Sequence, residues 1–262
     1  MRRLIEILRH GSPPNRDPRR TTIFGAIAVL LLVSPTRDLI LAGGRIGTIL
    51  GVDYRLYIDA TSRWLAGGSF YPAYELAAPF ATDHDVLYPP NAILLFAPFT
   101  VLPAVLWWAI PLGIVAWVIV RLRPDPVAWP FLAICLAWPA TALTIVVGNP
   151  VLWAVAALAL ALRHGWPAAL IWLKPSLFPF ALLGVWHRSW WLALGLLVAM
   201  SVPFGGLWED WFRVVWNSRV GGVFHSIQQV PLLLLPLIAW LGRTRRPAEA
   251  PAALEIAYTP IS

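Results

Sequence analysis

Long apolar runs, separated by short basic turns, constrain this sequence more than any other feature. Of its 262 residues 59% are hydrophobic and 13% are charged, so too little polar surface is available to coat a water-soluble globule. Backbone amides in hydrocarbon must be paired within a helix or a closed barrel, and the runs do not alternate with a period of two. The sequence therefore predicts an all-α, polytopic membrane bundle with about seven to nine membrane segments.

The distribution of charge predicts the sidedness of the chain. Residues 1–20 carry more arginines than acids, and the last apolar run ends at Arg243, Arg245 and Arg246. Because positively charged residues gather on the cytoplasmic side, both termini of this multi-pass chain are predicted to be cytoplasmic, in the plasma membrane. The residues behind the formal net charge of +7 lie mainly in such turns, so we expect no nucleic-acid partner. Membrane lipids are the expected partners.

Three regions follow from this pattern. Residues 1–20 form a basic cytoplasmic segment, 21–242 the membrane domain, and 243–262 an Ala- and Pro-rich cytoplasmic tail that is predicted to be disordered. Within the membrane domain, 22–41 is the first helix, 42–87 a long external loop, 129–147 one further helix and 205–222 a polar loop. Two topologies stay open for 88–120: two crossings, or a re-entrant piece followed by one crossing.

Asp53 begins a predicted amphipathic helix in the external loop. At the head of a helix, its carboxylate is either an N-cap or a general base that the helix N-terminus keeps ionised. Asp59 lies four residues from both Arg55 and Arg63, so we expect it to pair with them. The alternating acids Asp83 and Asp85 are typical of a metal-binding Asp-x-Asp pair, but acids in a loop are more often simply solvated.

Lys174 is the single lysine of the chain and lies well inside an apolar segment, 167–186, that is bounded by basic residues on both sides. If both turns are cytoplasmic, the segment must enter and return as two half-helices, with Lys174-Pro175 at the tip. An ammonium there is expensive unless it faces a polar interior, and its compact charge suits a phosphate. The alternative is a lysine that merely reaches water. His225, beside the external loop, could donate to the same phosphate or be an ordinary interfacial histidine.

The order of several motifs resembles glycosyltransferase family 87, which groups polyprenyl-phosphate-mannose-dependent mannosyltransferases with the C-type membrane fold. The resemblance covers roughly 22–202 and rests on Asp53-Tyr54, Tyr57, Ala60, Leu65, Gly67-Gly68, Tyr71, Tyr88-Pro89-Pro90, Leu94-Leu95, Pro98, Leu102-Pro103, Gly148-Asn149, Lys174-Pro175 and His187-Arg188.

The resemblance implies an inverting transfer of a sugar, usually mannose, from a polyprenyl-phosphate carrier to a glycan or glycolipid acceptor at the outer face of the membrane. It implies Asp53 as the catalytic base. The expected substrate-binding residues are Lys174, Tyr57, Tyr88, Asn149 and His225. Asn149 could instead only cap a helix. No cofactor is implied with certainty, although a divalent metal at Asp83 and Asp85 stays possible.

The chain is shorter than usual for that family, and two other classes of function therefore stay open. One is a non-catalytic lipid-binding or assembly subunit of the same ancestry. The other is a small transporter that uses Lys174 in a site at the membrane midplane.

Overall fold

The computed structural model describes residues 11, 17–41, 47–79, 85–218 and 227–244. The regular secondary structure of these ranges is helical, and an isolated β-bridge joins Pro124 to Arg243. The predicted all-α fold class is therefore confirmed. The α-helices are α2 (Pro18–Leu41), α4 (Val52–Leu65), α5 (Ala73–Ala77), α6 (Ile93–Phe96), α7 (Leu106–Leu122), α8 (Trp129–Ala137), α9 (Pro139–Val147), α10 (Val151–His164), α11 (Phe178–Ala181), α12 (Arg188–Ser201), α13 (Gly205–Asn217) and α14 (Val230–Leu241).

Short 3-10 helices join or extend the α-helices. They are η1 (Pro90–Ala92), η2 (Ala97–Thr100), η3 (Pro126–Ala128), η4 (Trp166–Leu173), η5 (Pro175–Leu177), η6 (Leu182–Gly184) and η7 (Val202–Phe204). Most of the predicted basic N-terminal segment and of the C-terminal tail lies outside the described residues.

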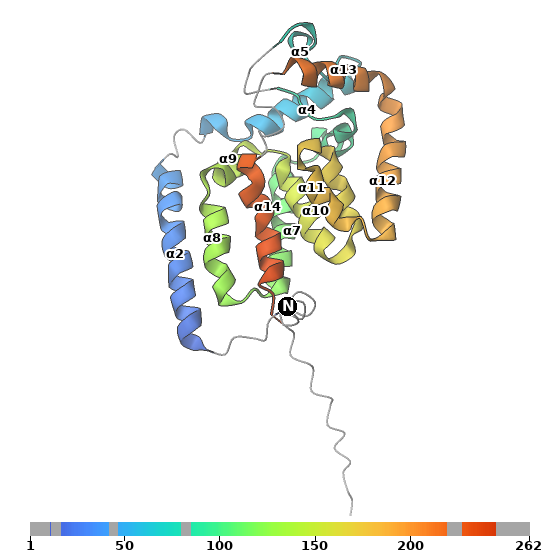
Figure 1. Ribbon diagram of the computed structural model, residues 1–262. Helices are drawn as coiled ribbons and strands as arrows, with labels where there is room; N and C mark the ends of the chain where they lie inside the picture. Colours follow the sequence, from blue (N-terminus) through green and yellow to red (C-terminus); the bar gives the residue numbers. More distant parts are fainter. Residues whose placement is uncertain (1–10, 12–16, 42–46, 80–84, 219–226, 245–262) are drawn as a thin grey trace, which may run out of the picture.

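The helices form a bundle that is covered at one end (Figure 1). Helices α2, α8, α14, α7, α10 and α12 run along the bundle, whereas α4, α5 and α13 lie across its upper end. Helix α2 packs on α8, α14 packs on α8, α10 and α7, and α12 packs on η4. The cross-lying layer therefore brings the amphipathic helix of the first loop over the ends of the bundle helices.

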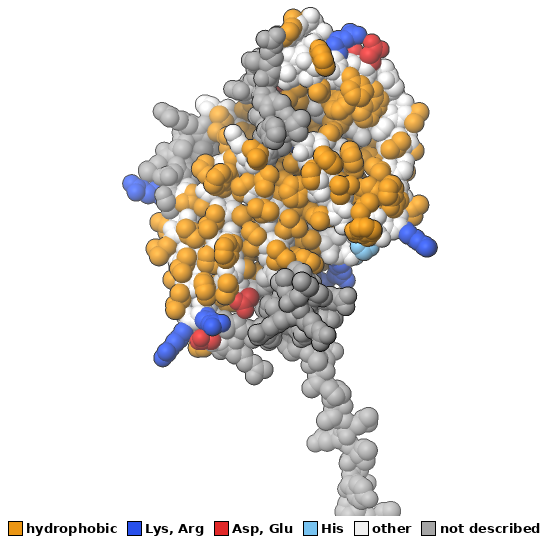
Figure 2. Space-filling view, viewed as in Figure 1, with side chains coloured by type: hydrophobic (Ala, Val, Ile, Leu, Met, Phe, Trp, Pro, Cys, Tyr) orange, Lys and Arg blue, Asp and Glu red, His pale blue; other side chains and the backbone are white. Residues whose placement is uncertain are grey.

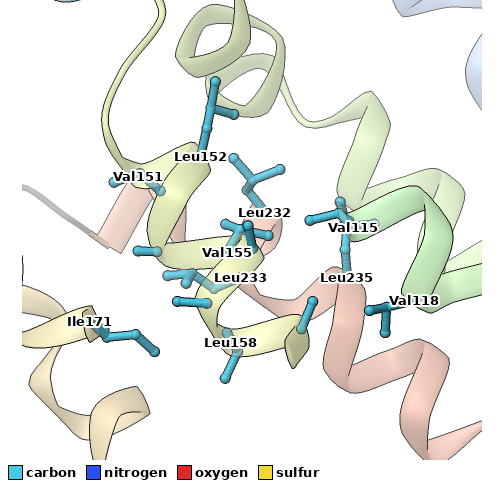
Figure 3. Packing of buried hydrophobic residues seen from close by; sticks show 14 of the residues in the cluster. Val115, Val118, Val151, Leu152, Val155, Leu158, Ile171, Leu232, Leu233 and Leu235 are labelled. Carbon is cyan, nitrogen blue, oxygen red and sulfur yellow. The ribbon is translucent and has the colours of Figure 1, made fainter. Parts of the chain in front are cut away.

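Helix α10 is the centre of the bundle (Figure 3). Residues 151–159 of α10 are buried except for Trp153, and they pack against α7, α14 and η4. Among the core residues labelled in Figure 3 are Val155 and Leu158 of α10, Val115 of α7 and Leu233 of α14. The alanines of α10 allow its neighbours to approach closely, and its large aliphatic side chains fill the space between them.

The outer surface of the bundle is apolar. Leu30 of α2 is 71% exposed and Leu192 of α12 is 75% exposed, and many other large hydrophobic side chains are also exposed. Figure 2 shows hydrophobic side chains across most of one face, with charged side chains mainly around its rim. Soluble monomers rarely expose an apolar area of this extent, so the surface supports membrane association.

One helical stretch of the described residues, Arg188–Asn217, is long and apolar enough to cross a membrane, and only 22% of its most apolar window is buried. A second span results if α8 with its preceding turn, Pro126–Ala137, is joined to α9, which it meets at a bend of 60°. The core helix of a soluble protein is mostly buried, so the exposed surface of Arg188–Asn217 supports membrane association. The other apolar helices are shorter, and the multi-pass topology stays a prediction.

Two predicted elements are wrong. The helix expected over 129–147 breaks at Trp138, whose ψ of 127° is extended because the following Pro139 disfavours the helical conformation before it. The polar loop expected over 205–222 instead contains α13, in which Trp208 and Trp211 pack inward on the core while Glu209 and Arg213 pair on the outside. An amphipathic helix of this kind has enough charge to read as a loop.

Residues 88–100 lie beside α4 in the structure, and which of the two membrane topologies applies to 88–120 stays a prediction. The Tyr88 ring lies 4.9 Å from the Tyr57 ring of α4, and the Phe99 carbonyl accepts a hydrogen bond of 3.4 Å from the Tyr54 hydroxyl. Both ends of the piece formed by η1, α6 and η2 thus remain beside α4. The chain then passes along the bundle once, as α7.

Candidate functional site

The start of α4 is fixed against the turn between α9 and α10. Gly51, with φ of 68°, donates its N–H to the Val146 carbonyl over 2.9 Å. Gly148 has φ of 71°, and a Cβ at this position would lie 2.6 Å from Cζ2 of Trp108. Only glycine combines this left-handed conformation with so close an approach. The indole N–H of Trp107 donates to the Gly148 carbonyl over 2.7 Å and so fixes the turn between α9 and α10.

Asp53 and Asn149 meet at this junction. The Asn149 side-chain amide donates from Nδ2 to Oδ2 of Asp53 over 2.5 Å, and its Oδ1 accepts the Val151 N–H over 3.1 Å. The second bond caps the start of α10 and fixes which way the amide points. The N-cap interpretation of Asp53 is wrong, because the N-cap of α4 is Gly51 and Asp53 is the second residue of the helix. Its carboxylate is partly exposed and still benefits from the first turn of α4.

Lys174 lies at the predicted break. Its backbone is extended, with φ of −126° and ψ of 90°, between η4 and η5, because Pro175 follows it. Its Nζ donates to Oε1 of Gln229 over 2.8 Å and lies 5.4 Å from the centre of the Tyr88 ring. The Asp53 carboxylate is close enough to act on the ammonium electrostatically. The Tyr88 ring that Lys174 contacts also meets the ring of Tyr57, which lies one turn of α4 beyond Asp53, so the same pair of rings connects the two residues.

Tyr57 and Tyr88 form the aromatic wall of the site. Both are buried, their rings meet edge to face, and Tyr57 stacks on Phe96. Burial raises the pKa of Tyr57 well above its usual value, and the negative charge of Asp53 adds to this effect, so the hydroxyl stays protonated. The buried Tyr88 hydroxyl has no hydrogen-bond partner among the described residues, whereas the Tyr88 carbonyl accepts from the Tyr71 hydroxyl over 2.9 Å.

The structure thus brings together Asp53, Tyr57, Tyr88, Asn149 and Lys174. Predicted candidates His225 and Asp83 lie outside the described residues. Asp85 is buried, with 6% of its surface exposed, so the expectation that it is simply solvated is wrong. Among the residues that the structure describes, no cluster of three or more His, Cys, Asp or Glu could hold a metal ion.

Asp59 does not form the expected charge ladder. Within the described ranges no ion pair joins it to Arg55 or Arg63, and ion pairs form instead between Asp17 and Arg20 and between Glu209 and Arg213. Arg63 instead donates to the carbonyls of Ser69 and Phe70, which shapes the loop after α4. The exposed Asp59 is therefore left on the outer side of the helix, away from the site.

The sequence did not lead us to predict a role for two residues in or near the site. Gln229 is buried and holds Lys174; the pair Gln228-Gln229 directly before an apolar run was the available signal. Glu75 is fully buried under α13, and burial raises its pKa, although its Oε1 accepts from the Val86 N–H over 2.9 Å and from the Tyr74 hydroxyl over 3.2 Å. Nothing in the local pattern around Glu75 distinguishes it from a solvated acid.

Comparisons of the chain with protein-family models, with curated proteins and with solved structures returned no match.

Proposed function

We propose that the chain is a multi-pass membrane glycosyltransferase that moves a sugar from a polyprenyl-phosphate carrier to a glycan or glycolipid acceptor at the outer face of the membrane. The proposal rests on one observation above all: a carboxylate and an ammonium, Asp53 and Lys174, face one site, and each is held by a neutral amide. Mannose is the sugar that the family resemblance implies.

This pair of charges suits the chemistry of an inverting transfer. The acceptor oxygen forms a bond to the anomeric carbon, and the bond from that carbon to the phosphate oxygen breaks, with its electron pair leaving on the phosphate. Asp53 takes the proton of the acceptor hydroxyl. Lys174 stabilises the charge on the departing lipid phosphate. Asn149 fixes the carboxylate so that it is already oriented when the acceptor arrives.

The arrangement of the bundle supports the proposed sidedness. The site lies at the end of the bundle that α4, α5 and α13 cover (Figure 1). Arg121 and Arg243 lie at the C-terminal ends of α7 and α14, each over a tryptophan ring, at the opposite end. With the arginine-rich end in the cytoplasm, the site opens on the outer face. On this proposal α2, α7, α8 joined to α9, α10, α12 and α14 are the crossings, and η4 to η6 form the broken pair around Lys174.

Reconstitution of the purified protein in lipid vesicles tests the proposal. Polyprenyl-phosphate-mannose is supplied with membrane glycolipid acceptors, and radiolabelled product is measured for wild type, Asp53→Ala and Lys174→Ala. We expect transfer by wild type and a loss of at least about a hundredfold in Asp53→Ala. Binding of the lipid phosphate without turnover by wild type would indicate the accessory subunit instead. Flux of a solute without any lipid donor would indicate the transporter.

A further inference from the structure

Gln229 is the neutral partner of the buried cation in the site. It lies directly before α14, is 8% exposed, and accepts a hydrogen bond of 2.8 Å from Nζ of Lys174. Among the described residues it is the one hydrogen-bond partner of that ammonium, and no described carboxylate forms an ion pair with Lys174. The neighbouring Gln228 is exposed, so the two adjacent glutamines have different surroundings.

The absence of a contacting carboxylate among the described residues has a chemical consequence. A buried ammonium is ordinarily paired with an acid, because an unpaired buried charge is costly. Here an amide oxygen orients the ammonium and the Tyr88 ring faces it, but neither carries a negative charge. Lys174 is therefore held in place by two neutral groups in direct contact, and Asp53 acts on it only from a distance, which leaves its Nζ available to an anion.

We propose that Gln229 is a positioning residue that sets the preference of the site for a lipid phosphate over a neutral lipid alcohol. This inference rests on the proposed function, in which Lys174 contacts the donor phosphate. A carboxylate at 229 would make the same hydrogen bond, but it would neutralise the ammonium and repel the phosphate. An apolar side chain at 229 would leave the ammonium without its fixed position.

The neutral amide also keeps the two charges of the site in separate roles. The Asn149 side-chain NH2 donates to the Asp53 carboxylate, and the Gln229 side-chain oxygen accepts from the Lys174 ammonium. Each charged group is therefore oriented by a neutral amide. If Lys174 swung into direct contact with Asp53, the base and the phosphate site would both be lost. Gln229 prevents this by anchoring the ammonium to the start of α14.

The test compares the binding of polyprenyl phosphate with that of the corresponding polyprenol to the purified full-length protein in detergent. The ratio of the dissociation constant for polyprenol to that for polyprenyl phosphate is measured for wild type, Gln229→Glu and Gln229→Met. Gln228→Glu is the control, because it adds the same charge to the exposed neighbour. We expect the ratio to fall by about tenfold or more in Gln229→Glu, to fall less in Gln229→Met, and to stay at the wild-type value in Gln228→Glu.

The ratio separates positioning from a merely structural role, because a folding defect weakens the binding of both lipids alike. If Gln229→Glu is not recovered as folded protein, Gln229→Met decides. A wild-type ratio in the Gln229 variants, with a wild-type protein that prefers the phosphate, overturns this inference and leaves the proposed function standing. A wild-type protein that binds both lipids equally overturns the phosphate site itself.

Discussion

The side-chain amide of Asn149 lies 2.5 Å from the carboxylate of Asp53, a residue 96 positions earlier in the chain. This contact joins α4 to the start of the central helix α10. It exists because Gly51 and Gly148, both with positive φ, let the two turns approach each other. The proposed base is therefore oriented by the core of the bundle rather than by its own loop.

Replacing Asn149 tests that orientation. In Asn149→Ala the carboxylate loses its donor, and we expect kcat for sugar transfer to fall by about ten- to a hundredfold, because a small displacement of a catalytic group is costly. Asn149→Asp should fall further, since it sets two carboxylates in contact. Steady-state kinetics of both variants checks this. Equal rates in Asn149→Asp and wild type would show that the contact has no role in transfer.

Gly148→Ala should destabilise the protein by about 1–3 kcal/mol, because alanine at φ of 71° is strained and its Cβ meets the Trp108 ring. Gly195→Ala is the matched control. Gly195 lies within α12 and nothing is within 4 Å of a Cβ built there, so the change should be neutral or stabilising by up to about 1 kcal/mol. Thermal unfolding of the two variants in detergent measures the difference, and equal Tm values would contradict the close approach.

Trp107→Phe removes the indole N–H that holds the Gly148 carbonyl. Because Trp107 is fully buried, the carbonyl loses a buried partner, and we expect a cost of about 1–3 kcal/mol in the free energy of unfolding. Trp191→Phe removes a similar bond, from Nε1 to the Val185 carbonyl over 3.0 Å, on a side chain that is 58% exposed. Water can replace that bond, so the Trp191 variant should lose less stability in the same unfolding assay.

Glu75 gives the stability a pH dependence whose sign follows from its burial. Desolvation is the largest effect on its carboxyl, and it raises the pKa of Glu75 above the usual value of 4.5. The folded state therefore favours the protonated form, so the contribution of Glu75 is fully present below the unfolded pKa and is lost as pH rises through the folded pKa.

Thermal unfolding across this pH range, from about 4 upward, measures the effect. Relative to wild type, Glu75→Gln should show a flatter fall of Tm with rising pH, because glutamine does not titrate. Glu209→Gln, which changes an exposed acid of α13, should retain the wild-type slope. If all three proteins show one slope, Glu75 does not carry the pH dependence.

Much of the site was predictable from local chemistry. The proline after Lys174 and the Gly-Asn-Pro sequence at 148–150 mark breaks that any backbone must obey, and both are present. The helix after Asp53 followed from its amphipathic spacing. Each of these features is determined by residues adjacent in the chain, so it can be predicted from the sequence alone.

The contacts between distant segments were not predictable in this way. Gln229 pairs with Lys174 across 55 positions, and no local pattern links them. Glu75 is buried because α13 covers it, with Asn217 donating to its carbonyl over 2.9 Å, and the charged residues of α13 made that helix look like a loop. Whether a residue is buried depends on which distant element packs against it. The periodicity of the sequence does not specify that element.

The most direct test of the proposed mechanism is the rate of sugar transfer by Asp53→Asn beside Asp59→Asn. Both changes remove one negative charge from α4 and keep the size of the side chain, but Asp53 faces the site and Asp59 the exposed side of the helix. With polyprenyl-phosphate-mannose as donor, kcat should fall by about a hundredfold or more in Asp53→Asn and stay near the wild-type value in Asp59→Asn. A wild-type kcat in Asp53→Asn would contradict the assignment of Asp53 as the base.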